Sequence, residues 1–312
     1  MTTRIDAAAT SVPRRRWFGR DGALHLSDAA ARTCLTRGHH RSSELELVIN
    51  VGMYKDHGLA EPALASMIQE DLGANLGHPP QAGTHGTFSF DVLNGGVGLI
   101  TAAHLCDAFV GSGVAKLAMI VAGDADPSPR TTRHYPFSAA GGAVLLAHDD
   151  HGAGFQRFLF RTYPEDAGLF VASTRWDPHA GRVRRGRNVL ELYEAPAFAT
   201  RCSDEGRAVV SELLAQVGLP PSGIDLLVTS AYPRTFAQDI ARGLGIASDR
   251  LPRLPAALAR AHTAGPIASL EVAIQSGQFA RAKHVVFVTA GAGLTIGAAY
   301  YRTDHRAAQL AA

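Results

Sequence analysis

The chain has 312 residues, of which 46% are hydrophobic and 19% charged, with 32 glycines and 16 prolines. This composition is enough for a large buried core and excludes an intrinsically disordered, collagen-like or low-complexity chain. The formal net charge is only +2, so the charge balance gives no support to a nucleic-acid-binding function.

Four predicted helices each run into a short apolar strand. In chain order, the helix and strand ranges are 29–38 with 44–54, 98–113 with 114–126, 207–218 with 223–233, and 265–277 with 281–293. Continuously apolar strands between helices of this length predict an α/β fold whose sheets are covered on both faces. The last two pairs repeat the first two, so the chain is expected to contain two related halves.

This repeat divides the chain into three segments. Residues 1–150 are predicted to form the N-terminal half and residues 198–312 the C-terminal half. Residues 151–197 are rich in arginine, glycine and aromatic side chains, and we interpret them as a connecting or capping insertion.

Targeting and cysteine patterns favour a cytoplasmic protein. The first residues lack the apolar core of a signal peptide, and no run of about 18 apolar residues predicts a membrane span. Cys34, Cys106 and Cys202 are too few and too scattered for a disulfide framework or a zinc cluster.

Asp124 and Asp126 follow an apolar strand as a pair of carboxylates, but a strand-end loop accounts for them without a metal. We therefore expect no metal site and no tightly bound cofactor.

Several motifs, in the same order along the chain, resemble β-ketoacyl-ACP synthase III enzymes of the thiolase superfamily. Residues 87–113 (TFSFDVLNGGVGLITAAHLCDAFVGSG) are similar to the family's nucleophile strand, turn and helix. Residues 137–147 (FSAAGGAVLLA) and 289–302 (TAGAGLTIGAAYYR) are similar to the glycine-rich strands that close its two halves. The resemblance implies a thiolase fold, with two pseudo-repeated α/β halves in a layered αβαβα arrangement.

The resemblance also shows that the family's catalytic triad is changed in this chain. A family cysteine at a helix N-terminus takes the acyl group, where helix N–H groups stabilise a thiolate. That position falls on Gly96, which follows Phe90-Asp91-Val92 as the cysteine does in the family. The family's histidine falls on Ser230 and its asparagine on His262. Claisen condensation through a cysteine acyl-enzyme is therefore not expected.

Two hypotheses stay open for Ser230 and His262, which face one pocket in this fold. A serine within hydrogen-bond reach of a histidine is the minimum for nucleophilic catalysis, so Ser230 is a candidate acyl acceptor and His262 a candidate base. Alternatively, both residues fill a pocket that has lost its activity.

Gly96 is either a degenerate nucleophile position or room for an anion at a helix N-terminus. The further candidate substrate-binding residues are Asn94, His85, Gly291 and Gly293.

Two functions from different classes follow from the resemblance. The first is an acyltransferase of ketosynthase III type that handles acyl-ACP or acyl-CoA with altered catalytic residues, in fatty-acid-like or polyketide and other specialised metabolism. The second is a catalytically inactive subunit that partners an active, cysteine-bearing homologue. Whether the chain is an enzyme by itself stays open. Family members dimerise through a strand that corresponds to residues 84–92, so a homodimer or heterodimer is expected.

Overall fold

The computed structural model describes residues 2–14, 21–58, 61–77, 86–128, 132, 134–179 and 186–303. The elements up to residue 149 are β1 (Thr2–Ser11), α1 (Ala23–Arg37), β2 (Leu47–Asn50), α2 (Leu64–Leu72), β3 (Phe88–Asp91), the 3₁₀ turn η3 (Gly95–Val97), α3 (Gly98–Gly111), β4 (Leu117–Asp124) and β5 (Ala140–Asp149). Later elements are β6 (Gly154–Thr162), β7 (Phe170–Asp177), β8 (Arg187–Glu194), α4 (Phe198–Val217), β9 (Leu226–Thr229), α5 (Phe236–Leu244), α6 (Gly265–Gln275), α7 (Gln278–Arg281), β10 (His284–Gly291) and β11 (Thr295–Arg302).

Two sheets of related topology form the body of the molecule. The first has the strand order β1-β5-β4-β2-β3, in which β2, β3 and β4 are parallel and β5 is antiparallel to both its neighbours. The second has the order β6-β11-β10-β9, in which β9 and β10 are parallel and β11 is antiparallel to both its neighbours. The second sheet therefore repeats the first four strands of the first, which confirms the predicted pair of related halves.

The segment 151–197 differs from the connecting insertion that we expected. Its residues Gly154–Thr162 form β6, which pairs with β11 as β1 pairs with β5. This strand lies at a sheet edge, and its outer residues Gln156 and Arg157 are exposed. Its polar side chains break the continuous apolar pattern that marks the buried strands, so the sequence did not reveal it. The inserted part is therefore shorter and begins after β6.

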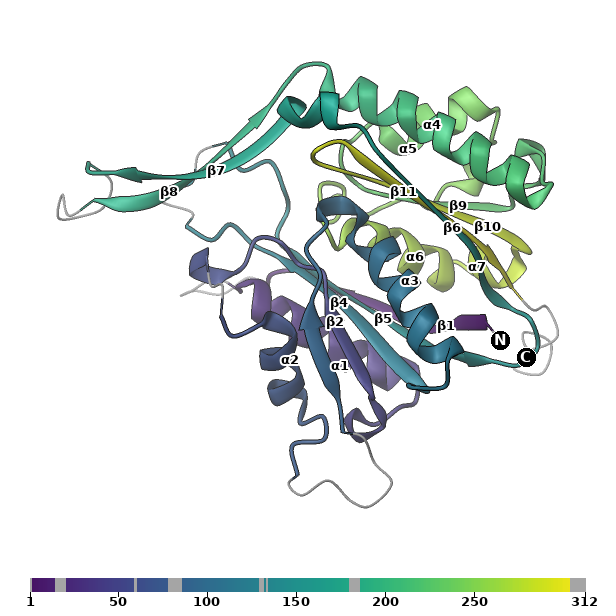
Figure 1. The fold of residues 1–312 in the computed structure, drawn as a ribbon, viewed down its shortest axis with the longest axis horizontal. Coiled ribbons are helices and arrows are strands. Elements are labelled where there is room, and N and C mark those ends of the chain that lie inside the picture. Colours follow the sequence, from purple (N-terminus) through teal and green to yellow (C-terminus); the bar gives the residue numbers. More distant parts are fainter. Residues whose placement is uncertain are drawn as a thin grey trace.

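Helices and sheets alternate in five layers, which confirms the αβαβα arrangement. Figure 1 shows α1 and α2 on the outer face of the first sheet, α3 and α6 between the two sheets, and α4 and α5 on the outer face of the second. The central layer contains the largest buried cluster, in which Ile100 of α3 and Ile267 of α6 join Ile120 of β4 and Phe287 of β10. The carboxyl ends of the parallel strands of both sheets are thereby held against each other.

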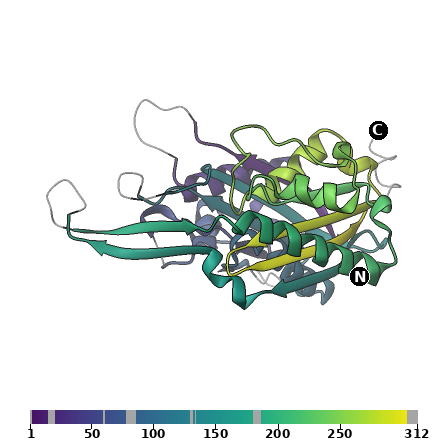
Figure 2. The same ribbon diagram turned by 90° about the horizontal axis from the view of Figure 1, so that it is seen from above.

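A two-stranded antiparallel hairpin, β7 and β8, projects from this body as an arm (Figures 1 and 2). Trp176 on the arm is 60% exposed. At the base, the ring of Phe170 lies 6.1 Å from that of Phe137 between centroids, and Glu194 accepts a hydrogen bond from the hydroxyl of Tyr232. The arm therefore joins the body beside the loops that carry the candidate site. In the described part of the chain, no helix has the length and apolar character needed to cross a bilayer.

Candidate active site

The candidate site lies where strand ends of the two halves meet. In doubly covered α/β sheets, ligand sites form at the carboxyl ends of the parallel strands. Here β4 ends at Asp124 and β9 is followed by Ser230, while η3 leads from β3 into α3. Backbone and side-chain contacts join these segments to the loops around His262 and Ala290.

Position 96, which the resemblance predicts to correspond to the family's cysteine, has no room for a side chain. A Cβ atom on Gly96 would lie 2.1 Å from the carbonyl oxygen of Ala290 and 3.8 Å from Oγ of Ser230. The backbone at the end of β10 therefore occupies the space that a nucleophile at this position would need. A side chain at position 96 would have to displace this backbone, while the role of Gly96 in binding an anion stays a prediction.

Ser230 lies beside this closed position. It is 3% exposed, and its Oγ accepts a hydrogen bond from the backbone N–H of Ala290 at 3.2 Å. The backbone N–H of Ser230 donates to the carbonyl of Val288 at 3.3 Å. The serine is thus fixed to the end of β10 and lies next to the family's nucleophile position.

His262 lies in an aromatic environment with one carboxylate beside it. Its side chain is 12% exposed, and Nδ1 is 3.5 Å from Oδ2 of Asp124. The ring centroid is 4.3 Å from that of Phe137 and 5.3 Å from that of Tyr54. His262 thus contacts Asp124 at the end of β4, whereas Ser230 is hydrogen-bonded to Ala290 of β10. The joint action of these two residues stays a prediction.

Asp124 is the charged centre of the site, and it was not among the predicted site residues. The carboxylate is 1% exposed and accepts backbone N–H groups of Met53 at 2.9 Å, Tyr54 at 2.7 Å and Thr263 at 2.9 Å, as well as the Thr263 hydroxyl. Burial alone would raise the pKa of Asp124. The neighbouring His262 and the donated hydrogen bonds outweigh burial and lower this pKa to about 2. The group is therefore a carboxylate at neutral pH.

The second carboxylate of the predicted pair has a different role. Asp126 accepts hydrogen bonds from the backbone N–H of Ser128 at 3.0 Å and from the hydroxyl of Thr132 at 2.5 Å. It therefore shapes a loop, as the sequence indicated, while Asp124 faces the other half of the molecule. Among the described residues, no group of three or more potential ligands could hold a metal ion.

The remaining predicted residues shape the backbone around the site. Asn94 donates from Nδ2 to Oγ1 of Thr101 at 2.9 Å, which ties the turn to α3. A Cβ atom on Gly291 would meet the carbonyl oxygen of Asn94 at 3.3 Å, so the two loops pack closely. Gly293 has a φ of +95°, which a residue with a Cβ rarely adopts. His85 lies outside the described residues.

The cysteines offer no replacement nucleophile. All three are buried and free of disulfides. Burial raises the pKa of the Cys34 and Cys202 thiols to about 12 and also raises the pKa of Cys106. The chain's cysteines are therefore protonated, buried thiols at neutral pH.

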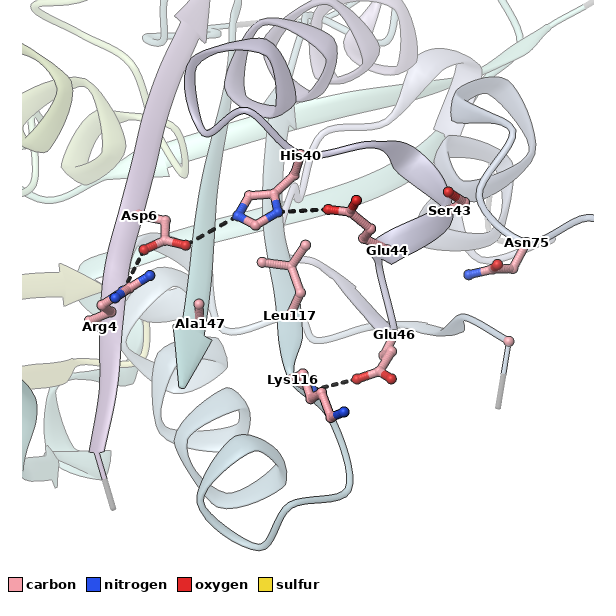
Figure 3. Close-up of a pocket in the computed structure, with 11 residues that line it drawn as sticks. Arg4, Asp6, His40, Ser43, Glu44, Glu46, Asn75, Lys116, Leu117 and Ala147 are labelled. Atoms are coloured by element: carbon pink, nitrogen blue, oxygen red, sulfur yellow. Dashed lines mark hydrogen bonds and ion pairs between the residues drawn. The ribbon is translucent and has the colours of Figure 1, made fainter. Parts of the chain in front are cut away.

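A separate cavity of about 390 Å³ lies at the opposite end of the first sheet, near the start of β4 (Figure 3). One of its walls is a chain of paired charges. His40 lies 2.8 Å from Oε2 of Glu44 and 3.2 Å from Oδ2 of Asp6, which in turn pairs with Arg4. Burial opposes the charge on His40, but the two carboxylates prevail and raise its pKa. These groups satisfy one another, and none of the predicted site residues that the structure describes lines this cavity.

Comparisons with known proteins agree with the resemblance found in the sequence. Residues 214–303 match the family model described as 3-oxoacyl-[acyl-carrier-protein] synthase III, C terminal. Over 306 residues the chain is 25% identical to β-ketoacyl-ACP synthase III of Roseobacter denitrificans, covering 94% of this chain and 88% of the relative. The corresponding enzyme of Xylella fastidiosa is 26% identical, covering 89% of this chain and 82% of that protein. The chain is thus similar to β-ketoacyl-ACP synthase III proteins over most of its length.

Solved structures confirm the thiolase fold of this synthase III-like chain. The 3-oxoacyl-ACP synthase III of Aquifex aeolicus has a TM-score of 0.75 at 18% identity, covering 96% of this chain and 100% of its own. A priming β-ketosynthase of a polyketide pathway has a TM-score of 0.78 at 17% identity and covers 96% of both chains. OleA of Xanthomonas campestris has a TM-score of 0.73 at 14% identity, covering 97% and 99%.

Proposed function

We propose that this chain is an acyltransferase that takes acyl-CoA or acyl-ACP thioesters and forms no cysteinyl acyl-enzyme. One observation carries the proposal. The Ala290 carbonyl closes position 96, while the hydroxyl of Ser230 lies beside that closed position. A nucleophile is therefore still present at the centre of the fold, although it comes from the other half of the molecule. The similarity to synthase III enzymes supports thioesters as the substrate class.

The proposed chemistry is acylation of Ser230. Its Oγ attacks the thioester carbonyl and forms an ester, while His262 accepts the hydroxyl proton. The carbon–sulfur bond breaks, and the departing thiolate takes the proton and leaves as free CoA or carrier thiol. A second substrate then takes the acyl group from Ser230. We place this reaction in the cytoplasm, in fatty-acid-like or specialised metabolism.

Intact-protein mass spectrometry tests the acyl-enzyme directly. The protein is incubated with a panel of acyl-CoA and acyl-ACP donors, beside Ser230→Ala and a matched control, Ser269→Ala. Ser269 is a second buried serine, 2% exposed, whose Oγ is 3.4 Å from the backbone nitrogen of Thr229. We expect an acyl mass increment on wild type and Ser269→Ala that is absent from Ser230→Ala. An increment that persists in Ser230→Ala contradicts the proposal.

A second candidate function is a non-catalytic subunit beside a cysteine-bearing homologue. The closure of position 96 and the 3% exposure of Ser230 favour it, because a substrate must displace packed backbone to reach either position. This function predicts no acyl increment with any donor, co-purification with the homologue, and loss of the homologue's activity when this chain is absent. Those three results together would replace the acyltransferase proposal.

A dimer is part of either function, and the edge of the first sheet offers the surface. In the described part of the chain, β3 pairs only with β2, so one side of this strand is open. Phe88 on β3 is 57% exposed, and the nearby Leu93 is 54% exposed. We propose pairing through this edge, because open edge strands recruit further strands. Phe88→Asp should shift the mass measured by light scattering from dimer to monomer.

A further inference from the structure

The carboxylate of Asp124 joins the two halves at the candidate site. It is the last residue of β4, and it accepts N–H groups from the loop after β2 as well as from Thr263 of the other half. These donors, together with the Thr263 hydroxyl, fix both carboxylate oxygens. Oδ2 is the oxygen that lies 3.5 Å from Nδ1 of His262. The carboxylate is thus held rigidly, with one oxygen beside the imidazole.

The imidazole has a different environment on each side. Nδ1 of His262 is buried and has no hydrogen-bond partner among the described residues; its charged neighbour there is Oδ2 of Asp124, 3.5 Å away. The rings of Phe137 and Tyr54 pack against the imidazole, and Tyr135 lies 5.3 Å from Tyr54 between centroids. Burial raises the pKa of both tyrosines, so their phenols are neutral. Among the described residues, the buried negative charge in contact with the ring is therefore Asp124, on the Nδ1 side.

We infer that Asp124 is a positioning residue that holds His262 with its proton on Nδ1 and leaves the lone pair on Nε2 to act as the base. The reason is that a carboxylate only accepts hydrogen bonds, so the nitrogen that faces it must carry the hydrogen. Nε2 then accepts the proton of the attacking hydroxyl, and the carboxylate stabilises the imidazolium that forms. This role rests on the proposed function, in which His262 is the base for acylation of Ser230.

The tautomer of His262 can be measured without any substrate. In protein labelled with ¹⁵N-histidine, long-range ¹H–¹⁵N spectra distinguish a protonated Nδ1 from a protonated Nε2, and His262→Gln identifies the signal. We expect Nδ1–H in wild type at pH 8. In Asp124→Asn the side-chain oxygen stays with the N–H groups of Met53 and Tyr54, so the new amide turns its hydrogens toward Thr263 and His262. We expect the proton to move to Nε2 and the acylation rate to fall by about 10²–10⁴-fold.

Thr263→Val is the matched control. It removes the hydroxyl that donates to Asp124 but leaves the carboxylate and imidazole in place. A purely structural role for Asp124 predicts that both variants unfold at lower temperature and both keep the wild-type tautomer. Positioning predicts that both variants lose stability, that only Asp124→Asn changes the tautomer, and that the acylation rate falls far more in Asp124→Asn than in Thr263→Val.

The outcomes separate this inference from the proposed function. A wild-type protein with its proton on Nε2 overturns the inference, whether or not Ser230 is acylated. Retention of Nδ1–H in folded Asp124→Asn also overturns it. If Asp124→Asn does not fold, the wild-type tautomer decides. A protein with Nδ1–H that takes no acyl group from any donor leaves the positioning of His262 intact and refutes the acyltransferase.

Discussion

Restoring a side chain at position 96 is the sharpest test of the closed nucleophile position. In Gly96→Cys the new Cβ would lie 2.1 Å from the Ala290 oxygen, and real Cβ atoms essentially never come nearer than 3.0 Å to such an atom. The oxygen belongs to backbone in the β10–β11 ladder, where Ala290 pairs with Ile296, so it cannot swing away as a side chain would. Overpacking of this kind costs about 1–3 kcal/mol. For a chain of this size, that lowers the melting temperature by roughly 1.5–5 °C.

Scanning calorimetry on Gly96→Cys and Gly96→Ala measures this loss, with Gly111→Ala as the control. Gly111 ends α3, and a Cβ atom there meets nothing within 4 Å, so its replacement should leave the melting temperature unchanged or raise it slightly. We also expect no acyl-cysteine in Gly96→Cys, because the thiol has no space beside the Ala290 backbone. Wild-type stability together with a stable acyl adduct on the new thiol would refute the closure.

Three further predictions concern buried and charged groups. Lys55→Met should cost about 3–5 kcal/mol in urea unfolding, because Asp91 would stay buried and charged without the ammonium group that pairs with it; an unchanged midpoint would contradict this. His40 has a raised pKa in the folded state, so its pairing with Glu44 and Asp6 stabilises fully below pH 6.5 and is lost as the pH rises through the folded pKa. In His40→Gln the denaturant midpoint of unfolding should therefore depend less on pH between pH 6 and 9. An unaltered pH dependence would show that the pairing of His40 with Glu44 and Asp6 does not stabilise the fold. The three cysteines should give no colour with Ellman's reagent until denaturant is added, and fast reaction in buffer would show an exposed thiolate.

The sequence predicted the layers of the fold because their signal is local. Buried parallel strands are continuous apolar runs, and β2, β4, β9 and β10 all lie within the ranges expected for them. Helix starts were harder to predict, since their caps come from distant residues. The N–H groups of Ala23 and Leu24 at the start of α1 donate to the Asp56 carboxylate, 33 and 32 residues further along the chain. Asp91 caps α2 in the same way, through Leu64 and Ala65. No nearby residue signals these starts.

The contacts of the candidate site residues could not be predicted from the sequence, and their role as an active site stays a prediction. The resemblance located positions 96, 230 and 262, and the structure places polar or closely packed groups at each of them. The contacts around these positions join distant parts of the chain, with 60 residues between Ser230 and Ala290 and 139 residues between Asp124 and Thr263. The one usable signal was an aspartate at the end of a fully buried strand. Such a charge needs several donors around it, so it marks a meeting point of segments.

Two of the three positions that the resemblance predicts to be changed, 96 and 230, share a contact with Ala290, which has a consequence for any attempt to introduce the family's residues. Because residue 96 is a glycine, the Ala290 carbonyl can lie against it, and the neighbouring N–H of Ala290 is then free to bind Ser230. His262 in turn is the side chain that lies beside the buried Asp124 carboxylate. Gly96→Cys or Ser230→His alone therefore meets a backbone fitted to the other residue. The combined variant Gly96→Cys, Ser230→His, His262→Asn must still displace the end of β10 before the thiol and imidazole can meet. We expect it to remain without a cysteinyl acyl-enzyme in the same mass-spectrometric assay, and an acyl-cysteine in the combined variant would show that side chains alone, and not the closed backbone, separate this chain from its condensing relatives.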